Sequence, residues 1–215
     1  MAHNPRLRNV LTLYTLADDI QCHRVRLVLA AKGISYEREL VDAAKPPSEL
    51  AELNPYVSAP TLIDRDLTLY ETTVICEYID ERFPHPPLMP IDPQSRARLR
   101  LLQTRVERDW LPMVAAIKAG GRTGETARRQ LRESLLASVP LFKMAKFVLN
   151  NEISLADCLV APLIWRLPAL GIDLPRSAAP VIDYGERLFA SQGFARSLTA
   201  DERALRQCAK LPRPP

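Results

Sequence analysis

The chain contains 215 residues, of which 47% are hydrophobic and 25% charged, with a formal net charge of +4. This apolar content is enough to form a core, and the small, scattered basic excess argues against a protein that grips nucleic acid through its phosphates. The N-terminus lacks the apolar core of a secretory signal, and no apolar run approaches the ~20 residues that cross a bilayer. The composition therefore predicts a cytoplasmic protein without a membrane segment.

Motifs for metals and nucleotide cofactors are missing from the sequence. The four cysteines form no C-x-x-C pair, which argues against a zinc cage or a disulfide framework and favours thiols in a reducing compartment. They are Cys22, Cys76, Cys158 and Cys208. The seven glycines form neither G-x-G-x-x-G nor a phosphate-binding P-loop. We therefore expect no metal and no cofactor.

Two strand-like segments flank a helix near the start of the chain. Residues 10–15 (VLTLYT) and 34–40 (ISYEREL) favour strands, and residues 22–33 between them have helical spacing and end at a glycine. The helix is expected to turn His23 and Arg24 outward. Because about thirty residues from strand to strand is the length of a βαβ unit, the two strands should pair in parallel.

The next sixty residues predict two further strands and two helices. Ser48 can cap a short helix over residues 49–53. Residues 57–70 (VSAPTLIDRDLTLY) favour two strands joined by a tight turn at Asp64–Asp66, and a helix follows over residues 71–83. The predicted order of this half is β-α-β-α-β-β-α.

A proline-rich stretch at residues 80–90 (DERFPHPPLMP), which we call the elbow, interrupts the chain. Proline removes a backbone donor and pushes the residue before it out of the α region, so the preceding helix must end at Phe83. The stretch predicts three parts: a strand-and-helix domain at residues 1–83, a proline-rich linker at 84–92, and an all-helical domain at 93–215. The elbow then serves either as a stiff contact surface or only as a rigid spacer.

The second half carries helix signals and no strand pattern. Asp92 followed by proline is a good helix start, and a buried stripe at helical spacing follows it. The stripe consists of Leu99, Leu102, Val106 and Trp110. Ser154 and Asp157 have the spacing of a capping box, and the helix that they open is apolar on nearly every side, which is typical of a central buried helix.

These features together resemble the glutathione S-transferase superfamily, with a thioredoxin-like N-terminal domain and a helical C-terminal domain. In that superfamily a cis-proline and the residue before it bind the cysteinyl part of glutathione, and an acid-hydroxyl pair holds the γ-glutamyl end. The resemblance carries these positions over to Ala59 and Pro60, and to Glu71 and Thr72. Thr72 replaces the usual serine of the pair.

The catalytic position departs from the superfamily pattern. A Ser, Cys or Tyr normally stabilises the glutathione thiolate there, and this sequence has Asp19 instead. An ionised aspartate cannot donate to a thiolate, and its like charge opposes thiolate formation. Tyr14 and Thr15 remain as substitutes. We expect no catalytic residue and no enzyme activity; the alternative is a glutathione-dependent transferase or isomerase.

A narrower resemblance, to the stringent starvation protein A family, rests on LNPYVSAPTLIDRDLTLYE, EYIDERFPHPPLMP and SLADCLVAPLIWRLPALGI. It implies a homodimer that binds RNA polymerase holoenzyme and its housekeeping sigma factor under starvation or stress, without reading DNA sequence itself. In that family a Pro-His-Pro surface is required for regulation, which carries over to Pro84, His85 and Pro86, with Pro87 beside them. A third possibility is a chaperone-like binder with the same fold.

Overall fold

The computed structural model describes residues 8–208, and side chains over residues 10–206. The chain divides into two compact units. Unit 1 combines the chain up to Pro86 with Arg196–Glu202, and unit 2 combines Pro87–Ala195 with the chain from Arg203 onward. The domain limits expected at residues 83 and 93 stay a prediction, and no sequence signal had assigned Arg196–Glu202 to the first half.

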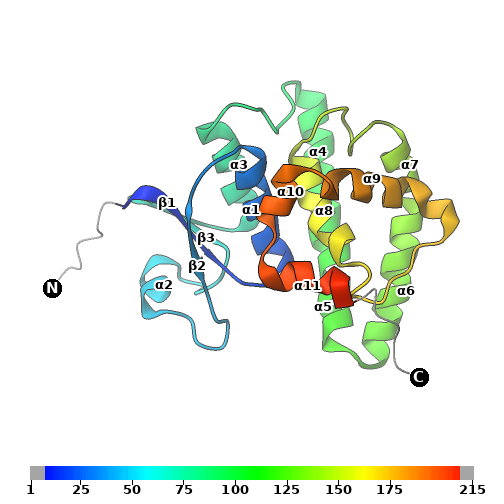
Figure 1. Cartoon of the computed structure of the whole chain (residues 1–215), viewed down its shortest axis with the longest axis horizontal. Coiled ribbons are helices and arrows are strands. Elements are labelled where there is room, and N and C mark those ends of the chain that lie inside the picture. Colours follow the sequence, from blue (N-terminus) through cyan, green and yellow to red (C-terminus); the bar gives the residue numbers. More distant parts are fainter. Residues whose placement is uncertain (1–7, 209–215) are drawn as a thin grey trace. The chain divides into compact units, whose positions relative to one another are not determined.

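Unit 1 contains a four-stranded sheet with helices (Figure 1). The spatial order is β2-β1-β3-β4, in which β1 pairs parallel with β2 and antiparallel with β3, and β3 pairs antiparallel with β4. The strands are β1 Arg8–Thr15, β2 Glu37–Leu40, β3 Thr61–Arg65 and β4 Leu67–Tyr70, and the helices are α1 Ile20–Ala31, α2 Ser48–Leu53 and α3 Thr72–Arg82. The predicted β-α-β-α-β-β-α order and the parallel first pair are confirmed.

The core of unit 1 lies where the sheet meets α1 and α3, which contact each other. Its fully buried side chains come from strands and helices alike: Leu13, Leu62, Val28, Leu29, Ile75 and Ile79. One detail of the prediction was wrong. Ser48 is the first helical residue of α2 rather than its cap, and Pro47 in the cap position has no side-chain oxygen to accept a hydrogen bond.

The expected outward orientation of His23 and Arg24 was also wrong. Both side chains are buried, as is the neighbouring Arg26. The ring Nε2 of His23 lies 2.9 Å from Ser197 Oγ, and Arg24 donates to Gln21 Oε1. Helical periodicity marks polar residues as outward-facing, but a polar side chain can be buried when distant parts of the chain supply its partners.

Unit 2 has helices and no strand within the described residues. Its helices, together with the C-terminal ones that also supply Arg196–Glu202, are α4 Pro93–Arg105, η1 Val106–Trp110, α5 Leu111–Ala119, α6 Gly121–Ala137, α7 Val139–Lys143, α8 Leu155–Arg166, η2 Arg176–Ala178, α9 Ala179–Phe189, α10 Gln192–Ser197 and α11 Ala200–Cys208. The π-helical turn η1 continues α4 into α5. Within residues 8–208 no helix combines the length and apolar character that crossing a membrane requires.

The helix signals of the second half are confirmed. Asp92 caps α4 through a hydrogen bond from Ser95 N, with Pro93 at the first helical position. Trp110 is fully buried and donates from its indole to Ser134 Oγ at 2.8 Å. The capping box opens α8, which is buried along most of its length.

The cysteines behave as small side chains of the core or its edge. Cys22 and Cys158 are buried thiols, and Cys76 is a half-buried one. The side chain of Cys208 lies outside the described residues. Within this part of the chain no group of three His, Cys, Asp or Glu residues could hold a metal ion.

Candidate functional site

The elbow presents its prolines and its histidine at the surface. Pro84, His85, Pro86 and Pro87 are all exposed, whereas the next residue, Leu88, is buried. The helix α3 ends as predicted, with Phe83 in the cap position. The His85–Pro86 peptide bond is cis. The candidate partner-binding residues therefore form one continuous exposed stretch of chain.

A buried lysine at the end of α1 holds this stretch from inside unit 1. The Lys32 side chain, in a residue 6% exposed, pairs with Asp80 Oδ1 at 2.5 Å. Its ammonium also donates to the carbonyl oxygens of Phe83 at 2.6 Å and Pro86 at 2.7 Å. These two carbonyls bracket Pro84 and His85, so one cation anchors both ends of the exposed loop.

Sequence reasoning missed Lys32. Its position just before Gly33 was informative only about the end of the helix, where a cation is favourable in any case. No local pattern connects it with carbonyls fifty residues later, because backbone acceptors are the same for every residue type.

We expect replacement of Lys32 by methionine, combined with Asp80→Asn to avoid a buried unpaired charge, to release the loop. Hydrogen bonds to a charged group contribute ~1.5–3 kcal/mol each, and two of them to loop carbonyls are lost. His85 has the only backbone N–H between Phe83 and Leu88, so ¹⁵N relaxation at this amide reports loop motion directly. Its order parameter should fall below about 0.6.

The matched control is Lys45→Met, which changes an exposed lysine of the same unit. It should leave the His85 order parameter unchanged. An order parameter in the Lys32→Met/Asp80→Asn variant equal to that of the unmodified protein would show that Lys32 does not hold the loop.

Asp19, which the resemblance predicts at the position of the superfamily's thiolate stabiliser, is the cap of helix α1. Asp19 is half-buried, and its Oδ1 accepts a hydrogen bond from Cys22 N at 2.8 Å, which stabilises the start of α1. The Cys22 thiol nearby accepts from Leu16 N at 3.3 Å. Burial, reinforced by the charge of Asp19, raises the pKa of Cys22 to about 12, so this thiol stays protonated near neutral pH.

The two hydroxyls considered as substitutes are engaged within the protein. The buried Tyr14 donates to Glu49 Oε2 at 2.9 Å and packs against Leu50 and Ile63. Thr15 is also buried, and its Oγ1 accepts a hydrogen bond from Arg26. A thiolate stabiliser must aim a donor at a bound thiol. The Tyr14 hydroxyl instead donates to Glu49, and the Thr15 hydroxyl donates to Leu16 O at 3.4 Å.

The remaining positions that the resemblance predicts for a glutathione site belong to unit 1. The Ala59–Pro60 bond is cis, with Pro60 buried and Ala59 half-buried. Asn54 shapes this turn by donating to Thr61 Oγ1 at 2.9 Å and to Ser58 at 3.1 Å.

The acid-hydroxyl pair marks the start of α3. Glu71 precedes the helix with a φ of 71° and is exposed, whereas Thr72 is its first residue and is buried. A positive φ is uncommon for a residue other than glycine.

A segment near the C-terminus completes unit 1, and sequence reasoning missed it. Arg26 donates to Glu202 Oε1 at 2.6 Å and to Ser197 O at 3.0 Å, with both charged side chains fully buried. Thr199 and Glu202 form reciprocal hydrogen bonds of a capping box at 3.0 and 3.1 Å. Thr199 also donates to Ala17 O at 2.6 Å. The Thr-x-x-Glu spacing was present in the sequence and would have revealed the start of α11.

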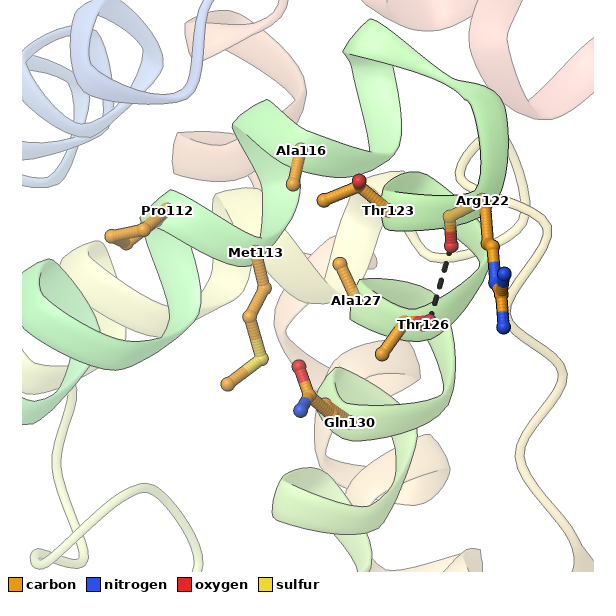
Figure 2. A pocket seen from close by; sticks show the side chains of 8 residues that line it. All are labelled: Pro112, Met113, Ala116, Arg122, Thr123, Thr126, Ala127 and Gln130. Atoms are coloured by element: carbon orange, nitrogen blue, oxygen red, sulfur yellow. Dashed lines mark hydrogen bonds between the residues drawn. The ribbon is translucent and has the colours of Figure 1, made fainter.

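A hollow of about 500 Å³ lies between α5 and α6 in unit 2 (Figure 2). Figure 2 shows Met113 and Ala116 facing Ala127 and Gln130, while Arg122 lies at the edge. The Thr126 hydroxyl donates to Arg122 O at 3.1 Å. The residues that line the hollow include one charged side chain, Arg122, and no cluster of acid-base groups. This hollow therefore suggests no catalytic chemistry.

Comparison with known proteins decides the family. Residues 9–81 match the glutathione S-transferase N-terminal domain, and residues 101–191 match the C-terminal domain. A protein of Haemophilus influenzae called "Stringent starvation protein A homolog" is 47% identical over 89% of this chain and 91% of its own length. The chain belongs to the stringent starvation protein A family, within the glutathione S-transferase superfamily. The resemblance and fold class inferred from sequence are thus confirmed.

Other members and more distant relatives agree with this placement. The stringent starvation protein A homologue of Coxiella burnetii is 44% identical over 93% of this chain and 97% of its own length. A solved maleylacetoacetate isomerase from Anaeromyxobacter dehalogenans, with glutathione bound in its active site, superimposes with a TM-score of 0.74. It is 28% identical and covers 88% of this chain and 94% of its own. The family therefore shares its fold with glutathione-dependent enzymes.

Proposed function

We propose that this protein is a non-enzymatic transcription regulator. It acts as a homodimer that binds RNA polymerase holoenzyme and the housekeeping sigma factor under starvation or stress, and it uses no cofactor. Its contact surface is the exposed stretch Pro84–Pro87, and it reads no DNA sequence itself. The observation that carries the proposal is the anchoring of this exposed loop by the buried Lys32.

The physical properties of the loop suit a contact surface. Prolines have few backbone conformations to lose, so a partner that docks on them sacrifices little entropy. Lys32 reduces the remaining freedom by binding the carbonyls on both sides of Pro84 and His85. A surface ordered before binding favours affinity without a large contact area.

The hydrogen bonds in the region where the superfamily binds glutathione support the same proposal. Asp19, Cys22, Tyr14 and Thr15 supply the carboxylate, thiol and hydroxyls in this region, and each makes hydrogen bonds within unit 1. The thiol is also protonated at neutral pH because burial raises its pKa. A thiolate brought by glutathione would meet the charge of Asp19 rather than a donor.

The test is co-purification with RNA polymerase from the native host. We expect the tagged unmodified protein to retain polymerase subunits and sigma factor. The triple variant Pro84→Ala/His85→Ala/Pro86→Ala should lose at least about 90% of them, because a handful of central residues carries most of the binding energy of an interface. Its far-UV circular dichroism should match that of the unmodified protein, which separates loss of the surface from unfolding.

A matched control separates loss of the surface from general loss of prolines. Lys45→Ala/Pro46→Ala/Pro47→Ala changes an exposed lysine and two exposed prolines in unit 1. This variant should retain polymerase as the unmodified protein does. Equal retention by the elbow variant would reject the assignment of the site.

The second candidate function is a glutathione-dependent transferase or isomerase. It is favoured by the similarity to the solved isomerase with bound glutathione. Retention on immobilised glutathione and turnover of chlorodinitrobenzene measure it directly, and we expect neither above background. Turnover by the unmodified protein that disappears in Tyr14→Phe or Thr15→Ala would show that the protein is an enzyme and would reject the proposed regulator.

A further inference from the structure

A hollow of about 390 Å³ in unit 2 begins at Pro87, the residue that directly follows Pro86 in the chain. Residues 87–92 form one wall, with Ser95 beside them. The other wall consists of Leu149, Asn150, Glu152 and Ile153. Leu88 and Met89 are buried, whereas Ile91 is 91% exposed. The first wall of the hollow therefore directly follows Pro86 in the sequence.

Both walls are anchored to the start of α8. Leu155 N donates to Leu88 O at 2.9 Å, which fixes the first wall. The capping-box carboxylate of Asp157 accepts from Val148 N at 2.9 Å, which fixes the chain that enters the second wall. Because these bonds fix the backbone at both walls, the hollow is ordered before any partner arrives.

The lining combines apolar surface with negative charge. Ile91 and Ile153 supply apolar side chains, and Asp92 and Glu152 supply exposed carboxylates. The residues that line the hollow include no lysine, arginine or histidine. Hydrogen bonds from Ser95 hold the Asp92 carboxylate in place and lower its pKa, so it is ionised at neutral pH.

We propose that this hollow binds a basic segment of a partner protein. An apolar side chain of the segment lies between Ile91 and Ile153, and a neighbouring lysine or arginine pairs with Asp92 and Glu152. The inference rests on the proposed function in that it names the chemistry of the partner's contact segment. The apolar side chain supplies most of the affinity, since exposed ion pairs contribute little energy but select the partner's charge.

The observations favour a protein segment as the occupant. The carboxylates of Asp92 and Glu152 are exposed, and the 91% exposed Ile91 is next to Asp92 in the chain. Charge complementarity excludes an acidic segment, because two carboxylates would repel it.

The test uses two short fluorescent peptides, one of leucine and lysine and its counterpart of leucine and glutamate. Fluorescence anisotropy should show that the unmodified protein binds the lysine peptide at least about tenfold more tightly. In Asp92→Ser/Glu152→Gln the preference should fall to about twofold or less, since serine keeps the cap of α4 while the charge is removed. The control Glu125→Gln/Asp183→Asn changes two exposed carboxylates of unit 2 outside the hollow, and should keep the preference.

The outcomes separate this inference from the proposed function. Failure of the elbow variant to lose polymerase rejects the proposed function, whereas the peptide preference is measured without polymerase. Absence of lysine-peptide binding, or an equal preference in the neutralised and unmodified proteins, overturns the inference. A change of oligomeric state in the neutralised variant, seen by sedimentation velocity, would also overturn it by making the hollow a contact between copies of the chain.

Discussion

Glu202→Ala is expected to lower the free energy of unfolding by about 3–5 kcal/mol, the usual cost of removing one partner of a buried ion pair. Glu202 is fully buried and accepts the 2.6 Å hydrogen bond from Arg26. The substitution leaves the Arg26 charge buried without its carboxylate, and it removes the acceptor of Thr199 N. The ring of His23, 3.7 Å from the same carboxylate, also loses a neighbour. Equilibrium urea unfolding measures the loss.

Asp201→Ala is the matched control, because Asp201 is the exposed neighbour of Glu202 in α11. Its effect should stay within about 0.5 kcal/mol. The double variant Arg26→Met/Glu202→Leu removes both charges, and it should be more stable than Glu202→Ala since no charge remains unpaired. A loss below about 1 kcal/mol in Glu202→Ala would mean that the ion pair does not hold this segment.

Asp157→Asn is expected to reduce stability by about 3 kcal/mol, because buried donors that lose an acceptor cost ~1–3 kcal/mol each. The carboxylate of Asp157 accepts from Ser154 N at 2.8 Å, from Ser154 Oγ at 3.1 Å and from Val148 N at 2.9 Å. An asparagine has a single acceptor oxygen, so its NH₂ group must face at least one of these donors. Burial raises the pKa of the Asp157 carboxyl, an effect that these donors oppose.

Thermal and urea unfolding measure this loss, with Asp183→Asn as the control at an exposed aspartate of the same unit. The control should change stability by no more than about 0.5 kcal/mol. Since Asp157 also anchors the chain at Val148, amide exchange over residues 148–153 should accelerate in Asp157→Asn before global unfolding. Unchanged exchange there would contradict the role of Asp157 in the wall of the hollow beside Pro87.

Local sequence signals were sufficient for most of the architecture. Asp92 with Pro93 and Ser154 with Asp157 mark helix starts through contacts within four residues, and the structure shows these contacts. The apolar stripe that ends at Trp110 is buried, as its helical spacing predicted, although the π-helical turn at Val106–Trp110 was not foreseen. The Thr199 capping box was equally local and was overlooked.

The glutathione-site positions show a different limit. The resemblance predicted them, and Asp19 led us to expect no catalysis there. The sequence could not show that Tyr14 donates to Glu49 or that Thr15 accepts from Arg26. Hydroxyl groups bind many partners, and only their spatial neighbours decide whether they remain available to a ligand.

The sequence by itself determined where the elbow lies and why it is stiff, because prolines restrict the backbone wherever they occur. Only the tertiary structure decided that Lys32 anchors the loop and that Arg26 is buried against Glu202. The physical reason is that these partners are separated by 54 and 176 residues, whereas helical and strand periodicity reports only neighbours within a turn or two. Sequence periodicity therefore cannot distinguish a buried charged residue from an exposed one, because the partner that pairs with the buried charge is distant in the chain.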